Sequence, residues 1–163
     1  MTVRTLVLLR HAKAANPDGV ADHDRPLSER GRRDAPAVGR WLREQGIVAE
    51  LAVVSSARRA RETFELAAAE LERAPTPLIT DSVYGASTGD LLDTVRELPA
   101  AVKVALLVGH NPSLGSLAAI LDERASATPE FKTSAVAVYE VGPSWPEVNP
   151  GTARLLASTV PRG

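Results

Sequence analysis

The sequence predicts an α/β protein: a three-layer α/β/α sandwich with a mostly parallel central sheet. Short, nearly continuous apolar runs are typical of strands that helices cover on both faces. Segments with apolar residues at helical spacing separate these runs, as in alternating β and α units. The chain shows no internal repeat and no linker-like tract, so we expect residues 1–163 to form a single domain.

Four β-rich runs are predicted to form the body of the sheet: residues 5–9, 51–54, 102–108 and 135–141. Residues 153–159 are expected to add an edge strand, and residues 77–80 a further short strand. The Pro- and Gly-rich stretch 141–151 is typical of a hairpin-like connection between neighbouring strands.

Four helices are expected between these strands. The first spans residues 28–45, and Gly46 follows it as a C-terminal stop. Pro36 predicts either a kink in this helix or a second start with Asp34 as the cap, because proline removes a backbone donor. The second helix spans residues 58–71 and the fourth spans residues 113–121. Between them, Thr88 caps the third helix, which carries Leu91, Leu92, Val95 and Leu98.

Composition excludes several functions. A formal net charge of −1 provides no broad basic surface, so we expect neither nucleic acid nor a membrane as a partner. The absence of cysteine excludes disulfides, thiolate nucleophiles and cysteine-based zinc sites. The first apolar run is too short for a signal peptide, and no stretch approaches the ~18–20 apolar residues of a membrane span. A cytoplasmic protein is the expectation.

Polar side chains follow three of the predicted strands, at the carboxyl ends where ligands bind in open α/β sheets. They are Arg10 and His11 after the first strand, Ser55, Ser56, Arg58, Arg59 and Arg61 after the second, and His110 and Asn111 after the third. Arginine forks match phosphate oxygens, and helix N-termini close behind Ser55 and Asn111 add positive dipole ends. A neutral imidazole can attack phosphorus. The set therefore predicts a site for a phosphoryl group.

Simpler interpretations exist for each residue. His11 alone could be a buried histidine with satisfied hydrogen bonds, and His110 a turn residue. By default, about two of Arg58, Arg59 and Arg61 belong to a solvated helix face. Two histidines could bind zinc, but no third ligand has suggestive spacing and His23 lies in a polar loop, so we expect no metal and no cofactor.

Four ordered motifs resemble those of the histidine phosphatase superfamily, which has the phosphoglycerate-mutase-like fold. They are LRHA at residues 9–12, RPLSERG at 25–31, SSARRARET at 55–63 and GHN at 109–111. The KTSAVA segment at residues 132–137 and the short chain most resemble the SixA-type phosphohistidine phosphatases.

The resemblance implies a role for each matching position. His11 would be the nucleophile that forms a phosphohistidine intermediate, Arg10 and Arg59 would hold the phosphate oxygens, and His110 would donate a hydrogen bond to the transferring group. Ser55 and Asn111 are further candidates for substrate binding. We expect the second ring nitrogen of His11 to donate to a backbone carbonyl. We also expect Arg10 and Arg59 to hold its pKa below about 6.5.

Two positions depart from the family pattern. Ala12 replaces a glycine, which only requires an unstrained backbone there. Asp81 stands where many members carry a glutamate that protonates the leaving group, and it could equally be a strand-end residue that caps the next turn. A weak or missing acid favours phosphoramidate substrates, because an imidazole leaves more easily than an alkoxide.

The resulting hypothesis is a metal-free phosphatase that removes phosphate from phosphohistidine in proteins or from small phosphorylated molecules. One alternative is a broad-specificity phosphomonoesterase. The other, from a different class, is a catalytically poor module that binds phosphoproteins; such a binder would have no need of His11.

Overall fold

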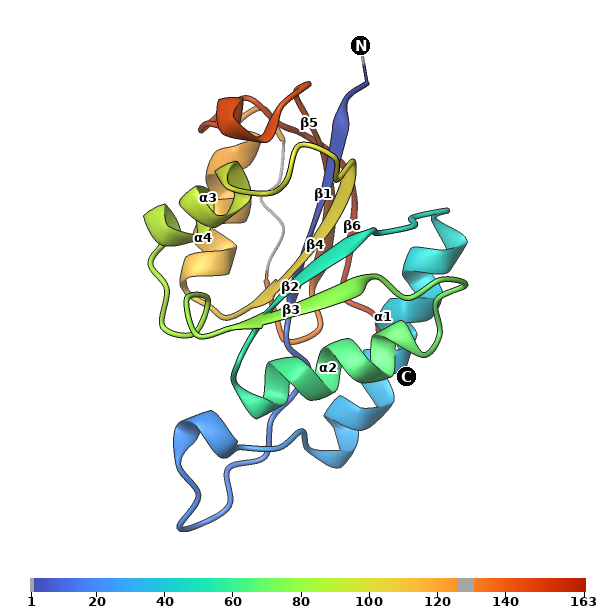
Figure 1. Ribbon diagram of the computed structural model, residues 1–163. Helices are drawn as coiled ribbons and strands as arrows, with labels where there is room; N and C mark the ends of the chain where they lie inside the picture. The colour runs from blue at the N-terminus through green and yellow to red at the C-terminus, as the bar shows by residue number, and fades with distance from the viewer. Residues whose placement is uncertain (1, 126–130) are drawn as a thin grey trace.

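A central mixed sheet organises the computed structural model, which describes residues 2–125 and 131–163. Within these residues six strands form the sheet in the order β3-β2-β4-β1-β5-β6 (Figure 1). Their bounds are β1 Arg4–Arg10, β2 Leu51–Ser55, β3 Thr76–Thr80, β4 Val104–Gly109, β5 Val136–Val141 and β6 Arg154–Thr159. The predicted α/β class and all six predicted strands are confirmed, with ends shifted by at most a few residues.

The first four strands of the chain run parallel. β1 pairs in parallel with β4, β4 with β2, and β2 with β3. β5 is antiparallel to β1 and β6 is antiparallel to β5, so the connection at residues 142–153 joins neighbouring strands as predicted. The carboxyl ends of β1, β2 and β4 therefore lie together at one edge of the sheet.

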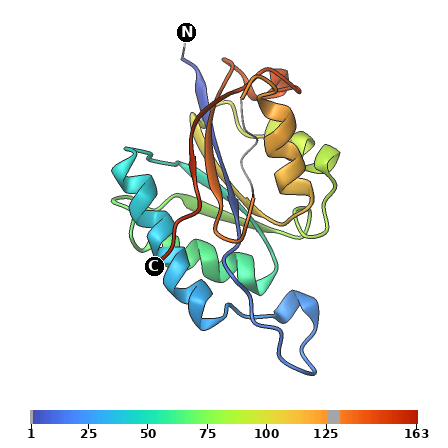
Figure 2. The ribbon, with the colours of Figure 1, turned by 180° about the vertical axis from the view of Figure 1, so that it is seen from behind.

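Helices cover both faces of this sheet (Figures 1 and 2). α1 Glu29–Glu44 and α2 Arg58–Ala68 pack together on one face, while α3 Thr88–Arg96 and α4 Ser113–Leu121 pack on the other. Two short 3-10 turns, η1 Asp22–Asp24 and η2 Trp145–Glu147, lie in the connections. No helix in residues 2–125 and 131–163 has the length and apolar character needed to cross a membrane.

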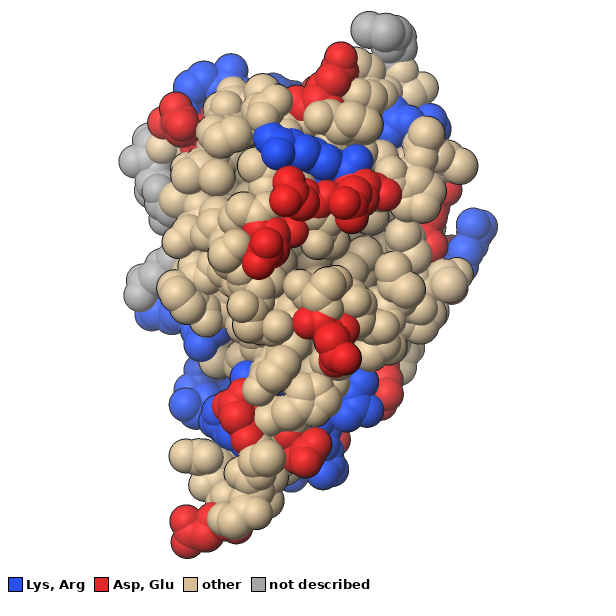
Figure 3. All heavy atoms as spheres, turned by 60° about the vertical axis from the view of Figure 1, so that its left-hand side comes forward, with Lys and Arg blue, Asp and Glu red and all other residues tan. Residues whose placement is uncertain are grey.

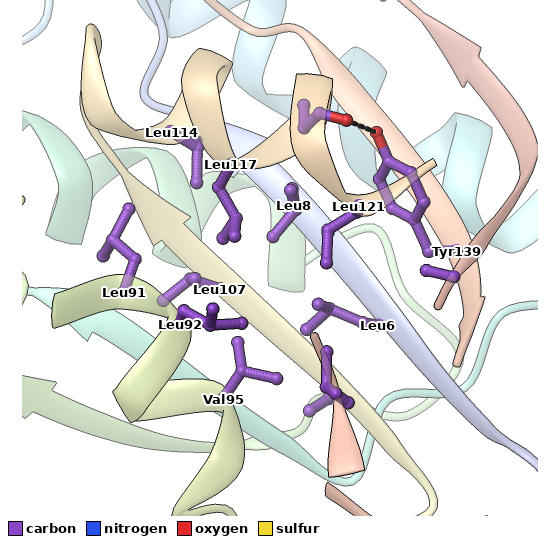
Figure 4. Packing of buried hydrophobic residues seen from close by; sticks show 14 of the residues in the cluster. Leu6, Leu8, Leu91, Leu92, Val95, Leu107, Leu114, Leu117, Leu121 and Tyr139 are labelled. Atoms are coloured by element: carbon purple, nitrogen blue, oxygen red, sulfur yellow. Dashed lines mark hydrogen bonds between the residues drawn. The ribbon is translucent and has the colours of Figure 1, made fainter. Parts of the chain in front are cut away.

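β1 contributes to both hydrophobic layers because successive side chains of a strand point to opposite faces. Leu6 and Leu8 pack beneath α3 and α4, where Figure 4 shows them among leucines from both helices. Val7 and Leu9 pack on the opposite side with α1 and α2. All four are fully buried (0% exposed), so the strand that leads to Arg10 and His11 is fixed in the centre of the molecule.

Three details of the helices differ from the prediction. α1 runs from Glu29 to Glu44 without a second start, because Asp34 is buried and accepts hydrogen bonds from Arg162 and the Gly163 N–H instead of capping a helix. Ser87, not Thr88, caps α3, and its side chain accepts from the Asp90 N–H. α2 ends at Ala68, and residues 69–71 form a turn.

Gly46 ends α1 as predicted. It adopts a positive φ of 72°, which glycine tolerates, and lets the Ile47 N–H return to the carbonyl of Leu42 at 3.0 Å.

Candidate active site

A cavity of about 210 Å³ opens at the carboxyl ends of β1 and β4. It contains most of the residues that the sequence predicts for the site. The lining residues are Arg10, His11, Lys13, Ala14, Arg25, Arg59, His110, Asn111 and Thr133. Side chains that are far apart in the sequence thus meet at one edge of the sheet.

His11 follows β1 directly, and hydrogen bonds at both its backbone N–H and its carbonyl fix its position. Its N–H donates to the carbonyl of Gly109 at 3.2 Å, and its carbonyl accepts from the Ser134 N–H at 3.1 Å. The ring nitrogen Nδ1 lies 2.8 Å from the Ala12 carbonyl, which can only accept, so Nδ1 carries the proton. The lone pair is therefore left on Nε2, the nitrogen available for attack, and the predicted backbone contact is confirmed.

Burial keeps the His11 ring neutral. The pKa of His11 falls to about 3, mainly because of burial; the hydrogen bond to the Ala12 carbonyl opposes this shift, and the charges of His110, Arg59 and Arg10 add to it by smaller amounts. The direction agrees with the prediction, but the cause differs: the sequence argument relied on the two arginines, whereas loss of water around a residue only 7% exposed dominates.

Thr63 connects the His11 segment to α2. Its buried hydroxyl accepts a hydrogen bond from the Ala12 N–H at 2.9 Å and donates to the carbonyl of Arg59 at 2.6 Å. The same threonine that closes the SSARRARET motif thus links the His11 segment to α2. The motif includes Thr63, but no local pattern in the sequence indicates this role.

The structure separates the three arginines of α2 as helical geometry requires. Arg59 is 7% exposed and lines the cavity. Arg58 is exposed and pairs with Glu62 at 3.2 Å, and Arg61 donates to the carbonyl of Ser56 at 2.9 Å. Only one of the three therefore faces the candidate site, in agreement with the motif that selects Arg59.

His110 follows β4 and rests on the end of β2. Its Nε2 lies 2.7 Å from the Ser55 hydroxyl, and its ring centroid lies 5.1 Å from that of His11. Burial is the main cause that lowers the pKa of His110 to about 4, so both imidazoles are neutral near pH 7. Ser55 is fully buried and does not line the cavity; its contact is with His110.

Positive charge dominates the cavity. Arg10, Lys13, Arg25 and Arg59 line it, and no described lining residue is a carboxylic acid. Burial, and then the neighbouring charge of Arg59, lowers the pKa of Arg10. Arg10 Nε and His110 Nδ1 are buried without a hydrogen-bond partner in the described chain. Such a set of cations and unsatisfied polar groups favours an anion.

Asn111 and Asp81 differ in their relation to this cavity. Asn111 lines it, but its amide is already engaged: the nitrogen donates to the Phe131 carbonyl at 2.5 Å and the oxygen accepts from the Gly115 N–H at 3.1 Å. Asp81 is exposed in the turn after β3 and does not line the cavity, and its carbonyl accepts from the Tyr84 N–H at 3.0 Å. Asp81 thus belongs to the turn through its backbone, but the Thr80 hydroxyl, and not Asp81, accepts the Ser82 N–H at 3.1 Å.

The RPLSERG motif positions the loop that follows His11. The backbone N–H and hydroxyl of Ser28 donate to the Lys13 carbonyl at 2.9 and 3.0 Å, and the same hydroxyl accepts from the Gly31 N–H. A Cβ at Gly31 would lie 2.1 Å from that carbonyl, so only glycine permits this approach. The motif alone does not indicate this contact between Gly31 and the Lys13 carbonyl.

Asp22 and Tyr84 were not predicted as site residues. Asp22 Oδ2 lies 3.1 Å from Arg59 Nη2 and accepts from the Tyr84 hydroxyl at 2.7 Å. The Tyr84 ring lies 5.8 Å from that of His110. The only signal for Tyr84 in the sequence is the Tyr84–Gly85 pair that follows Asp81. Asp22 lies in a polar loop without periodicity, so no signal points to it.

The described residues offer no group of three or more His, Asp or Glu side chains that could hold a metal ion. The predicted absence of a metal therefore stays a prediction, which activity measurements can test.

Comparison with known proteins assigns the class. The model of the histidine phosphatase superfamily (branch 1) matches residues 6–128. The chain is 38% identical over 164 residues to an uncharacterized protein of Mycobacterium tuberculosis. This alignment covers 94% of this chain and 100% of that protein. The chain therefore belongs to the histidine phosphatase superfamily.

Solved structures narrow the resemblance. A protein assigned as phosphohistidine phosphatase SixA from Nakamurella multipartitia is 30% identical with a TM-score of 0.87, over 99% of this chain and 98% of that one. The protein histidine phosphatase SixA complexed with tungstate is 25% identical with a TM-score of 0.81, over 96% and 97% of the two chains. The fold is phosphoglycerate-mutase-like and SixA-like, as predicted, and the family supports phosphatase activity.

Proposed function

We propose that this protein is a phosphohistidine phosphatase in which His11 takes the phosphoryl group from a phosphorylated histidine and then yields it to water. The observation that carries this proposal is the state of His11: a neutral ring, with Nδ1 bound to the Ala12 carbonyl and Nε2 free, beside a cavity lined by arginines. The likeness to SixA proteins supports the choice of substrate.

The proposed roles follow from the contacts. Arg10 and Arg59 hold the phosphoryl oxygens and offset the charge that develops during transfer. The Ser55 hydroxyl donates to His110 Nε2, so that His110 Nδ1 carries its proton and donates to the phosphoryl group. When Nε2 of His11 bonds to phosphorus, its ring becomes cationic, and the Nδ1–H bond to the Ala12 carbonyl stabilises that charge.

A nitrogen leaving group suits this cavity because none of the described lining residues is a carboxylic acid that could protonate an oxygen leaving group. An alkoxide leaving group needs a proton donor, whereas an imidazole that is already protonated departs as a neutral molecule. The exposed Asp81 and the absence of a carboxylic acid among the described lining residues both favour a nitrogen leaving group. Neither feature favours the alternative of a broad-specificity phosphomonoesterase.

The decisive experiment compares hydrolysis of a phosphohistidine peptide with that of a small phosphate ester at matched concentrations. We expect the peptide to be preferred, and His11→Ala to abolish both reactions. Preference for the ester would support a phosphomonoesterase, and tight binding without turnover would support a phosphoprotein-binding module. Inversion of configuration at phosphorus would show direct attack by water and would overturn the role of His11.

A further inference from the structure

A carboxylate lies beside the cavity without belonging to its lining. Asp22 comes from η1, in the loop between β1 and α1 that projects from the body of the molecule (Figures 1 and 2). Figure 3 shows acidic and basic side chains next to one another at this lower end. The Asp22 side chain is 54% exposed, and its two carboxylate oxygens pair with two arginines of the cavity lining: Oδ1 with Arg25 Nη1 at 3.2 Å and Oδ2 with Arg59 Nη2 at 3.1 Å.

The charge of Asp22 is not needed to hold Arg59. Arg59 Nη1 donates to the main-chain carbonyl of Asp22 at 2.8 Å, a contact that any residue at this position can make. An asparagine would also keep a side-chain oxygen for Arg59 Nη2 and for the Tyr84 hydroxyl. The contacts with Arg59 and Tyr84 therefore do not require the negative charge of Asp22, whereas the ion pair of its Oδ1 with Arg25 does.

The Asp22 carboxylate stays ionised at neutral pH, and its charge affects groups that line the cavity. The hydrogen bond from Tyr84 is the largest cause that lowers the pKa of Asp22 to about 2, and Arg59 and Arg25 contribute to the same shift. Burial and then Arg59 lower the pKa of His110, while Asp22 acts in the opposite direction. Asp22 thus favours positive charge on an imidazole in this part of the molecule.

We propose that Asp22 is a specificity-determining residue that favours substrates whose leaving group carries a positive charge. This inference rests on the proposed function and extends it, because it assigns a part of the preference for nitrogen–phosphorus bonds to one side chain. The substrate imidazole enters protonated on the ring nitrogen that does not bear phosphorus, and the Asp22 carboxylate stabilises this cation.

The transfer step then balances without an enzyme acid. The Nε2 lone pair of His11 forms the new bond to phosphorus, and the electron pair of the broken phosphorus–nitrogen bond returns to the substrate ring. That ring leaves as neutral imidazole and keeps its own proton, while the positive charge appears on the His11 ring. An ester behaves in the opposite way: its leaving oxygen gains negative charge, which Asp22 repels.

The test is the ratio of kcat/KM for an N-phosphorylated substrate to that for an ester, measured with Asp22→Asn. The probes are phosphoramidate and a phosphohistidine peptide on one side and p-nitrophenyl phosphate on the other. We expect Asp22→Asn to lower this ratio about tenfold, which corresponds to about 1.4 kcal/mol. Asp22→Glu, which keeps the charge, should retain most of the ratio.

Asp24→Asn is the matched control. Asp24 lies in the same 3-10 turn, but its side chain is 70% exposed and its ion-pair partner is His23 at 3.6 Å, not Arg59. The ratio should be unchanged in this variant. Thermal unfolding of each variant shows that the fold is retained.

Other outcomes overturn the inference. Equal losses on both substrate classes would mean that Asp22 only positions Arg59, and an unchanged ratio in a folded Asp22→Asn protein would mean that its charge has no role. If the wild-type enzyme cleaves neither class, or if His11→Ala remains active, the proposed function itself fails. The wild-type and His11→Ala measurements thus separate failure of the proposed function from failure of the role of Asp22.

Discussion

The central strands β1 and β4 end at the cavity, whereas the edge strand β3 ends at the protein surface. β1 ends at Arg10 and leads to His11, and β4 leads to His110, and all three residues line one cavity. β3 ends just before Asp81, which is exposed and lies outside that lining. All of these strands run parallel to one another in one sheet, so strand direction alone does not place a residue in the site.

The helices shield the central strand β1 from solvent more completely than the edge strand β3, and this explains why their ends differ. The β1 side chains from Leu6 to Leu9 are 0% exposed, whereas Leu78 and Ile79 of β3 are 52% and 44% exposed. A groove of about 430 Å³ with a largely apolar lining runs beside β3 and contains no predicted site residue. The central strands β1 and β4 thus deliver the residues at their ends to the cavity, whereas the edge strand β3 delivers its end to solvent.

The largest expected effect contrasts His11 with Asp81. His11→Ala removes the proposed nucleophile and should lower kcat/KM by at least about 10³-fold. Asp81→Asn should change it by less than about twofold, because the side chain lies outside the cavity lining. Steady-state kinetics on the same phosphohistidine peptide measures both variants. A tenfold or larger loss in Asp81→Asn would show that this residue reaches the leaving group and that the contrast between strand ends is wrong.

The second comparison contrasts two neighbours on α2. Arg59→Ala should lower kcat/KM about 30- to 1000-fold, equivalent to about 2–4 kcal/mol, because it removes a charge-assisted contact in a partly desolvated cavity. Arg58→Ala should have little effect, since adjacent residues on a helix point about 100° apart and Arg58 faces solvent. Similar losses in the two variants would contradict the assignment of Arg59 to the site.

Sequence reasoning could predict the fold and the central residues because both depend on strong local signals. The buried strands are continuous apolar runs, and the residues after residues 5–9 and 102–108 are polar groups that are costly to bury. Their convergence follows from the rule for parallel sheets. Selection among Arg58, Arg59 and Arg61 needed the family motif, since helical spacing alone does not say which direction faces the site.

The remaining features depend on contacts that no local pattern encodes. Asp22 approaches Arg59 only because the loop after His11 folds back over α2, and Asp34 is buried through hydrogen bonds to Arg162 and Gly163 at the other end of the chain. The dominant cause of the low pKa of His11 is desolvation, which depends on the packing of the entire sheet and not on the charges beside it in the sequence.

A third prediction compares two adjacent serines at the carboxyl end of β2, Ser55 as its last residue and Ser56 as the next. Ser55→Ala should lower kcat about tenfold, because the hydroxyl that orients His110 at 2.7 Å is lost. Ser56→Ala removes a hydroxyl that contacts His23 at 2.9 Å and should have a much smaller effect. The measurement is kcat at saturating substrate, with thermal unfolding as the check on folding. Equal rates in the two variants would mean that His110 is positioned without Ser55.

A fourth prediction concerns stability at acid pH. Burial lowers the pKa of His11 from 6.5 to about 3 in the folded protein, so below about pH 6.5 the unfolded chain binds a proton that the folded chain excludes. His11 therefore lowers the free energy of unfolding only below that pH. The loss grows as the pH decreases, by at most about 1.4 kcal/mol per pH unit for this residue. His11→Asn should flatten the dependence of the urea midpoint on pH between 7 and 5, roughly the interval in which an exposed histidine titrates. An unchanged slope would show that His11 is not buried in the neutral form.

The smallest expected effect is that of chelation, and the charges in the cavity give the reason. Arg10, Lys13, Arg25 and Arg59 all line it and would repel a divalent cation. The proton on His11 Nδ1 is committed to the Ala12 carbonyl, and His110 Nε2 is committed to Ser55, so each imidazole offers at most one nitrogen to a metal. We therefore expect full activity after prolonged treatment with excess EDTA and gel filtration into metal-free buffer. Added zinc should inhibit or have no effect. Loss of activity on chelation that zinc or manganese restores would mean that a metal, and not the arginines, stabilises the phosphoryl group, and the difference between Arg59→Ala and Arg58→Ala would then need another explanation.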